Sequence, residues 1–114
     1  PVFVFACEND EIAPWQSAMR VAGIFEGPVN CVLGQGGHNS GVICPPDSAR
    51  YDHCRLDSKQ PTDREKARHI KGSWWVSWLA FLTETQGNSC APPAPGGGLR
   101  PVLEPAPGRY VRQR

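Results

Sequence analysis

A strand–helix–strand pattern in residues 2–33 constrains the fold of this chain more than any other feature of its sequence. Residues 2–6 (VFVFA) are a continuous apolar run rich in β-branched and aromatic side chains, and residues 29–33 (VNCVL) are a second short apolar run. Such runs are typical of strands that are buried on both faces. Because a helical pattern with short connections separates the two runs, the strands are expected to be parallel, with a right-handed crossover. We therefore predict an α/β fold.

The predicted helix between these strands begins near Pro14, a residue suited to a first helical turn, and ends before Gly27-Pro28. Its apolar residues recur at spacings of three and four, which places them on one face. They are Trp15, Ala18, Val21, Ala22 and Phe25.

The pattern changes from Ile43 onward. Cys44-Pro45-Pro46 interrupts regular structure, since each proline removes a backbone donor and restricts the residue before it. Residues 47–68 are polar and predict an exposed excursion with one irregular helix. Residues 73–86 return to a helical period, with Ser73 as the expected N-cap. Residues 88–108 hold most of the remaining proline and glycine and predict an extended tail.

Charge and hydropathy exclude two classes of partner. The net charge of +1 gives no case for nucleic acid, and the basic run 64–72 is typical of a solvated face. No apolar run approaches the roughly 18 residues of a membrane span. The chain begins at Pro1 without a charged and apolar leader, so we expect no signal peptide and expect a piece of a longer polypeptide.

The five cysteines are irregularly spaced and odd in number, which argues against a disulfide framework. There is no C-x-x-C. The nearest approach to a zinc ligand set is Cys44, His53, Cys54 and His69, but their gaps fit no common spacing. We expect free thiols in a reducing compartment and no metal site.

An acid and a histidine follow the two predicted strands. Ligands and catalytic groups collect at the carboxyl ends of parallel strands, so the side chains of Asp10 and His38 are expected to be hydrogen-bond neighbours. A catalytic histidine needs such a carboxylate to fix its tautomer and stabilise its charged form. The alternatives are that Asp10 only forms a turn or caps a helix and that His38 is only exposed. Three nearby glycines, Gly36, Gly37 and Gly41, would allow the sharp turn that presents the imidazole.

A nucleophile for such a pair is not found in this sequence. No G-x-S-x-G or G-x-C-x-G occurs, and Gly37-His38-Asn39-Ser40-Gly41 places its serine one position late. The order acid then histidine is that of the last two triad members in α/β-hydrolases, whose nucleophile comes earlier in the chain.

Four motifs in order resemble the C-terminal part of polyhydroxyalkanoate (poly-β-hydroxybutyrate) synthases. PVFVFACENDEIAPW resembles the strand-then-acid motif of that family, and VLGQGGHNSGVICPP resembles its histidine motif. GSWWVSW resembles its tryptophan-rich helix, and LEPAPGRYV resembles its C-terminal signature.

This resemblance implies an α/β-hydrolase-like catalytic domain with a Cys-His-Asp triad, in which Asp10 and His38 are catalytic and the cysteine lies upstream. It implies an acyltransferase that polymerises (R)-3-hydroxyacyl-coenzyme A and releases coenzyme A, without a cofactor. The implied partners are this substrate, the growing polyester and the missing N-terminal half. A homodimer is implied for the full-length protein, located in the cytoplasm at the surface of polyester granules. We assign residues 1–87 to the catalytic domain and residues 88–114 to a tail.

Several positions depart from the family pattern. Glu11 stands where histidine is usual, and Asn39 and Ser40 replace apolar or small residues, while Cys44 stands where asparagine is common. The alternatives are another α/β-hydrolase, such as an esterase or depolymerase, and an inactive remnant of a synthase gene.

The helix over 73–86 carries a wide apolar stripe, which would either line an acyl or polyester channel or pack into a core. Core packing is the more frequent use, and we predict it here. The stripe consists of Trp74, Trp75, Trp78, Leu79 and Leu82.

Overall fold

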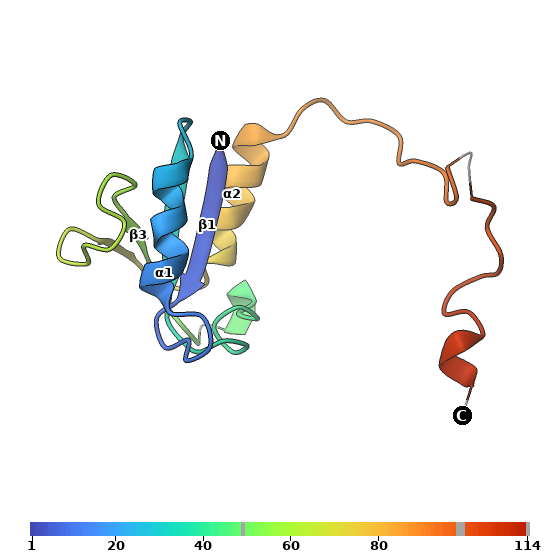
Figure 1. Ribbon diagram of the computed structural model, residues 1–114, viewed down its shortest axis with the longest axis horizontal. Coiled ribbons are helices and arrows are strands. Elements are labelled where there is room, and N and C mark those ends of the chain that lie inside the picture. The colour runs from blue at the N-terminus through green and yellow to red at the C-terminus, as the bar shows by residue number, and fades with distance from the viewer. Residues whose placement is uncertain (49, 98–99, 114) are drawn as a thin grey trace.

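A computed structural model describes residues 1–48, 50–97 and 100–113. Strands β1 (Val2–Cys7) and β2 (Val29–Gly34) are parallel and are joined by a helical crossover, as the sequence predicted. Helix α1 (Trp15–Met19) and helix α2 (Trp75–Thr85) lie on opposite sides of β1 (Figure 1). These elements agree with the predicted α/β class, but the sheet as a whole is mixed rather than parallel.

The α-helical part of the crossover is shorter than predicted. After Met19 the chain continues as the 3-10 helix η1 (Arg20–Ile24), and Phe25 is 44% exposed. Phe25, which was predicted to share a helical face with Trp15, lies after η1 in extended backbone and so is not part of that face.

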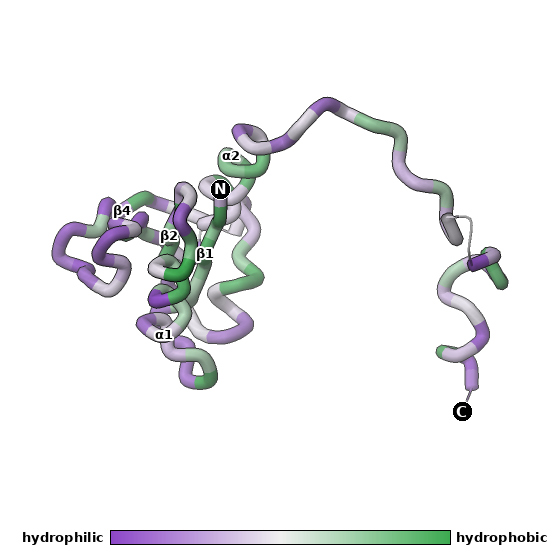
Figure 2. The backbone as a smooth tube through the Cα atoms, turned by 45° about the horizontal axis from the view of Figure 1, so that its top comes forward, coloured by the Kyte–Doolittle hydropathy of each residue, from purple (hydrophilic) through white to green (hydrophobic). Residues whose placement is uncertain are grey.

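The core lies between α1 and one face of the sheet. Alternate residues of β1 and β2 point to this face, including Val4, Ala6 and Leu33. Trp15 and Met19 of α1 pack against them, and Met19 is fully buried. Strands β1 and β2 are hydrophobic, whereas the loop at the left of the picture is hydrophilic (Figure 2).

Two further strands lie in the segment that was predicted to be an exposed excursion. Strand β3 (His53–Leu56) is antiparallel to β2, and strand β4 (Arg68–Ile70) is antiparallel to β3. The order across the sheet is β1-β2-β3-β4. The prediction for residues 47–68 is therefore wrong in this part. The only helix here is the 3-10 helix η2 (Pro46–Ser48), within the residues the structure describes.

These strands escaped prediction because they are short and are stabilised by their partners. Residues His53–Leu56 read HCRL, which is too brief for a clear alternation, yet His53, Cys54 and Leu56 are buried. Their backbone groups pair with β2, whose partner residues lie 19 to 25 positions earlier in the chain.

Helix α2 forms where it was predicted. It begins at Trp75, and its N-cap is Trp74 rather than the predicted Ser73. Ser73 lies one residue earlier, and its Oγ accepts a hydrogen bond from the Trp75 backbone N–H at 3.0 Å. The ring of Trp74, just before the helix, stacks on Phe5 with 3.8 Å between centroids. The ring of Phe81 lies against Phe3 in a tilted arrangement, with 5.3 Å between centroids.

Core packing of the whole apolar stripe is not observed. Trp78 is 42% exposed, Leu79 is 64% exposed and Leu82 is 40% exposed. With Pro46 and Trp75 these residues line an apolar groove of 230 Å³. The prediction is wrong for these outer residues because α2 is apolar around most of its circumference, and the sheet covers only one side of it.

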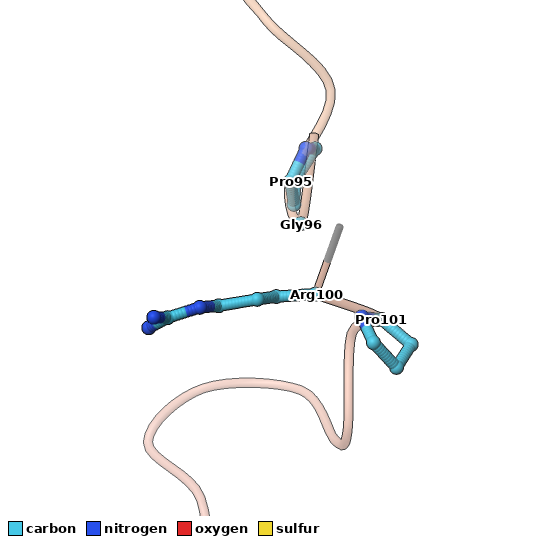
Figure 3. Close-up of a pocket in the computed structure, with 4 residues that line it drawn as sticks. All are labelled: Pro95, Gly96, Arg100 and Pro101. Carbon is cyan, nitrogen blue, oxygen red and sulfur yellow. The ribbon is translucent and has the colours of Figure 1, made fainter. Parts of the chain in front are cut away.

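Beyond α2 the chain leads away from the sheet (Figure 1). Its regular element among the described residues is the 3-10 helix η3 (Tyr110–Arg112). Pro95, Gly96, Arg100 and Pro101 surround a hollow in this segment (Figure 3). The division into residues 1–87 and 88–114 stays a prediction, and residues 98, 99 and 114 lie outside the described residues.

Candidate active site

The turn after β1 fixes the carboxylate of Asp10. Its Oδ1 accepts hydrogen bonds from the backbone N–H groups of Ile12 at 2.9 Å and Ala13 at 2.8 Å. Asp10 is therefore a turn former, which was one of the two interpretations of this residue. Its second oxygen, Oδ2, is directed elsewhere.

The loop after β2 presents His38 through a tight glycine-rich turn. Gly36 has a φ of +94°, in the left-handed region that favours glycine. A Cβ at Gly41 would lie 2.6 Å from the Cys7 Sγ and 2.7 Å from the Gln35 carbonyl oxygen, so only glycine fits there. The predicted sharp turn is present.

Asp10 and His38 meet at the carboxyl edge of the parallel strands. His38 Nδ1 lies 2.9 Å from Asp10 Oδ2, as the order of the elements predicted. A carboxylate can only accept, so Nδ1 carries the proton in this hydrogen bond. The other ring nitrogen, Nε2, is then left unprotonated in the neutral imidazole and can take up a proton.

The pair is asymmetric in its exposure and charge. The Asp10 side chain is 9% exposed and the His38 side chain is 48% exposed. The hydrogen bond from Ala13 N–H, followed by that from His38, lowers the pKa of the Asp10 carboxyl below its ordinary value. Asp10 is thus a charged acceptor, and His38 is open to a reacting molecule.

A cavity of 120 Å³ lies beside the pair. Its other lining residues present mostly apolar atoms and one thiol: Phe5, Ala6, Cys7, Ala13, Ala18 and Val42. The arrangement can therefore hold an apolar group against a histidine that is ready to transfer a proton.

The cysteines beside this site and in the core are not activated thiols. All five are free, and every one except Cys90 is buried. Burial raises the pKa of Cys7 to about 11, with Asp10 adding to the effect. Burial also raises the pKa values of Cys31 and Cys54. At neutral pH these three thiols are protonated and are poor nucleophiles.

The residues weighed for a zinc site are used in other ways. His53 Nδ1 lies 2.7 Å from the Gly72 carbonyl oxygen and its Nε2 lies 2.7 Å from Ser77 Oγ, so both ring nitrogens have protein partners. Within residues 1–48, 50–97 and 100–113, no group of three or more His, Cys, Asp or Glu side chains is placed to hold a metal ion.

Two contacts around the site were not predicted from the sequence. Arg64, from the loop between β3 and β4, forms an ion pair with Glu8, close to Asp10. Ser40 Oγ accepts a hydrogen bond from Gly37 N–H at 3.3 Å, so this departure from the family pattern is part of the turn itself. The ion pair leaves no local signal, since Arg64 and Glu8 are 56 residues apart, whereas Gly37 and Ser40 are only three residues apart.

Fold and site together define an α/β protein with a histidine–carboxylate pair at the carboxyl edge of its sheet. No family model matches the chain. It is, however, 34% identical over 118 residues to the poly(3-hydroxyalkanoate) polymerase subunit PhaC of Cupriavidus necator. It is 34% identical over 117 residues to the corresponding subunit of Rhizobium etli and 36% identical over 118 residues to the poly(3-hydroxyalkanoate) polymerase of Methylorubrum extorquens.

These matches cover the whole chain but 20%, 18% and 20% of the three relatives, so the chain spans about a fifth of their length. The family resemblance is confirmed: the chain matches the C-terminal part of poly(3-hydroxyalkanoate) polymerases. No helix among the described residues is both long and apolar enough to cross a membrane.

Proposed function

We propose that this chain supplies the acid and the histidine of a Cys-His-Asp triad in an α/β-hydrolase-like poly(3-hydroxyalkanoate) polymerase. The observation that carries the proposal is the 2.9 Å contact between His38 Nδ1 and Asp10 Oδ2. The names of the curated relatives supply the reaction class, since they are poly(3-hydroxyalkanoate) polymerases. The raised pKa of Cys7 agrees with a nucleophile that lies outside this sequence.

In the proposed reaction, His38 Nε2 takes the proton of the upstream cysteine thiol. The thiolate attacks the thioester carbonyl of a (R)-3-hydroxyacyl-coenzyme A. The bond from that carbonyl to the coenzyme A sulfur breaks, and coenzyme A leaves with the proton from His38. The 3-hydroxyl of the next 3-hydroxyacyl-coenzyme A then gives its proton to His38 and attacks the acyl group on the cysteine. The carbonyl–sulfur bond to the cysteine breaks, the cysteine sulfur takes the proton back from His38, and the new ester bond lengthens the polyester by one unit.

Asp10 would hold the histidine tautomer and stabilise the imidazolium during each proton transfer. Its Oδ1 already accepts two backbone hydrogen bonds and its Oδ2 accepts one from His38. One acceptor position remains on Oδ2, and this position can accept a hydrogen bond from the substrate 3-hydroxyl.

The proposed reaction needs no cofactor, because the coenzyme A thioester is the substrate and coenzyme A is the product. The proposed partners are the growing polyester chain, the upstream part of the catalytic domain and, in the complete protein, a second copy. The proposed location is the cytoplasm, at the surface of polyester granules.

A chimera tests the proposal directly. Residues 1–114 would replace the matching residues of the Cupriavidus necator polymerase, and coenzyme A release from 3-hydroxybutyryl-coenzyme A would be measured. We expect release, and we expect His38→Ala to reduce it by about 10²- to 10⁴-fold because the proton acceptor is lost.

His69→Ala is the matched control, because His69 is an exposed histidine on β4. It should release coenzyme A at the unaltered rate. A chimera that releases none, or one in which His38→Ala is as active as the control, would refute the proposal. Hydrolysis of an ester without polymer formation would support the esterase alternative instead.

A further inference from the structure

The start of α2 contacts the segment that follows His38. The Nε1–H of Trp74 donates to the Gly41 carbonyl oxygen at 3.1 Å, and the Nε1–H of Trp75 donates to that of Val42 at 3.0 Å. The hydroxyl of Ser73 donates to the Cys44 carbonyl oxygen. The Nε1–H of Trp74 also lies 3.3 Å from the Val42 carbonyl oxygen, so three consecutive residues at the start of the helix bind three carbonyl groups of residues 41–44.

The bound carbonyls belong to the same turn as His38. Gly41 N–H donates to the Gly37 carbonyl oxygen at 2.9 Å, and Ile43 N–H donates to that of Asn39 at 2.9 Å. A displacement of residues 41–44 would therefore also move residues 37–39. Val42 in addition lines the cavity beside His38.

The donors are themselves held to the sheet. The Trp74 ring stacks on Phe5 of β1, with an interplanar angle of 17°. His53 of β3 binds the Gly72 carbonyl oxygen through Nδ1 and Ser77 Oγ through Nε2, which ties the first turn of α2 to the sheet. Asp52 Oδ1 accepts a hydrogen bond from Gly72 N–H at 2.6 Å. The loop is thus bound by groups whose positions the sheet determines.

We propose that Ser73, Trp74 and Trp75, here called the indole clamp, are positioning residues for His38. They fix the backbone after His38 so that its imidazole stays within reach of Asp10 and faces the cavity. The catalytic consequence rests on the proposed function, but the clamp itself does not. This role accounts for the tryptophan-rich motif better than core packing does, since Trp75 uses its indole N–H and is only partly buried.

The test uses Trp75→Phe in the same chimera, because phenylalanine keeps an aromatic ring and removes the N–H donor. We expect kcat to fall about tenfold with KM for the thioester unchanged, since a misplaced general base slows the reaction without altering substrate binding. Hydrogen exchange of the amides in residues 37–44, followed by mass spectrometry, should rise about fivefold. Exchange in β2 and β3 should not change, which shows that the variant is folded.

Trp78→Phe is the matched control, because Trp78 is on the same helix, is 42% exposed and has no hydrogen-bond partner for its indole N–H in the part of the chain that the structure describes. It should change neither kcat nor exchange. Trp75→Phe with unaltered kcat and unaltered exchange in residues 37–44 would overturn the clamp. If the unaltered chimera releases no coenzyme A, the proposed function fails, and the exchange measurement alone then decides whether the clamp exists.

Discussion

The βαβ unit of residues 2–34, with the loops that follow its strands, differs from the segment of residues 46–85 in what it contributes. The first region carries Asp10 and His38 on loops at the ends of parallel strands. The second adds strands β3 and β4 to the sheet. Its helix α2 holds the His38 loop through side-chain donors. The residues of the candidate site and the residues that hold the His38 loop therefore come from different parts of the chain.

The largest expected effect is the loss of coenzyme A release when Asp10, the acid of the first region, is replaced. Asp10→Asn preserves the size of the side chain and the acceptor for Ile12 and Ala13, but its amide no longer specifies the tautomer of His38. We expect coenzyme A release by the chimera to fall about a thousandfold. This is a much larger loss than that expected for the clamp variant. A loss no greater than that of Trp75→Phe would show that the two regions contribute equally to the reaction.

A second, smaller effect is on the free energy of unfolding, and it should differ between the helices of the two regions. Met19 of α1 is fully buried, so Met19→Ala should lower the free energy of unfolding by about 2–5 kcal/mol through lost burial and a cavity. Leu79 of α2 is 64% exposed, so Leu79→Ala should change it by less than about 0.5 kcal/mol. Urea denaturation followed by fluorescence measures both. A large loss at Leu79 would mean that another surface covers α2 in solution.

The smallest effect is the pH response of the first region. Backbone N–H of Ala13 and the His38 ring bind the charged form of Asp10 and lower its pKa from 3.8. The unfolded chain therefore binds the proton more readily, and this contribution to stability is present above the unfolded value and lost as pH falls through the folded pKa. The difference in unfolding free energy between the unaltered protein and Asp10→Asn should contain this contribution at pH values above 3.8. It should shrink below pH 3.8. A difference that does not depend on pH would contradict this assignment.

The first region could be predicted from sequence to a large extent. The apolar runs of residues 2–6 and 29–33 correctly indicated parallel strands, and the order of strand, acid, helix, strand and histidine correctly placed Asp10 beside His38. The predicted helix was too long, because the α-helix becomes a 3-10 helix after Met19 and Phe25 is extended.

The second region was predicted less well, because its structure depends on distant partners. Strand β3 is stabilised by β2 and was mistaken for an exposed excursion. Helix α2 was found, but not that its first residues bind the His38 loop or that its outer residues are exposed.

The sequence by itself determined the elements of the βαβ unit and the two residues of the candidate site, since period and order along the chain encode them. Only the tertiary structure decided that Trp74 and Trp75 contact the residues after His38 and that Arg64 pairs with Glu8. The indole of Trp74 binds a backbone carbonyl 33 residues earlier, and Arg64 pairs with a carboxylate 56 residues earlier. No local pattern in a sequence specifies a partner at such a distance, because strand pairing has to bring the two segments together first.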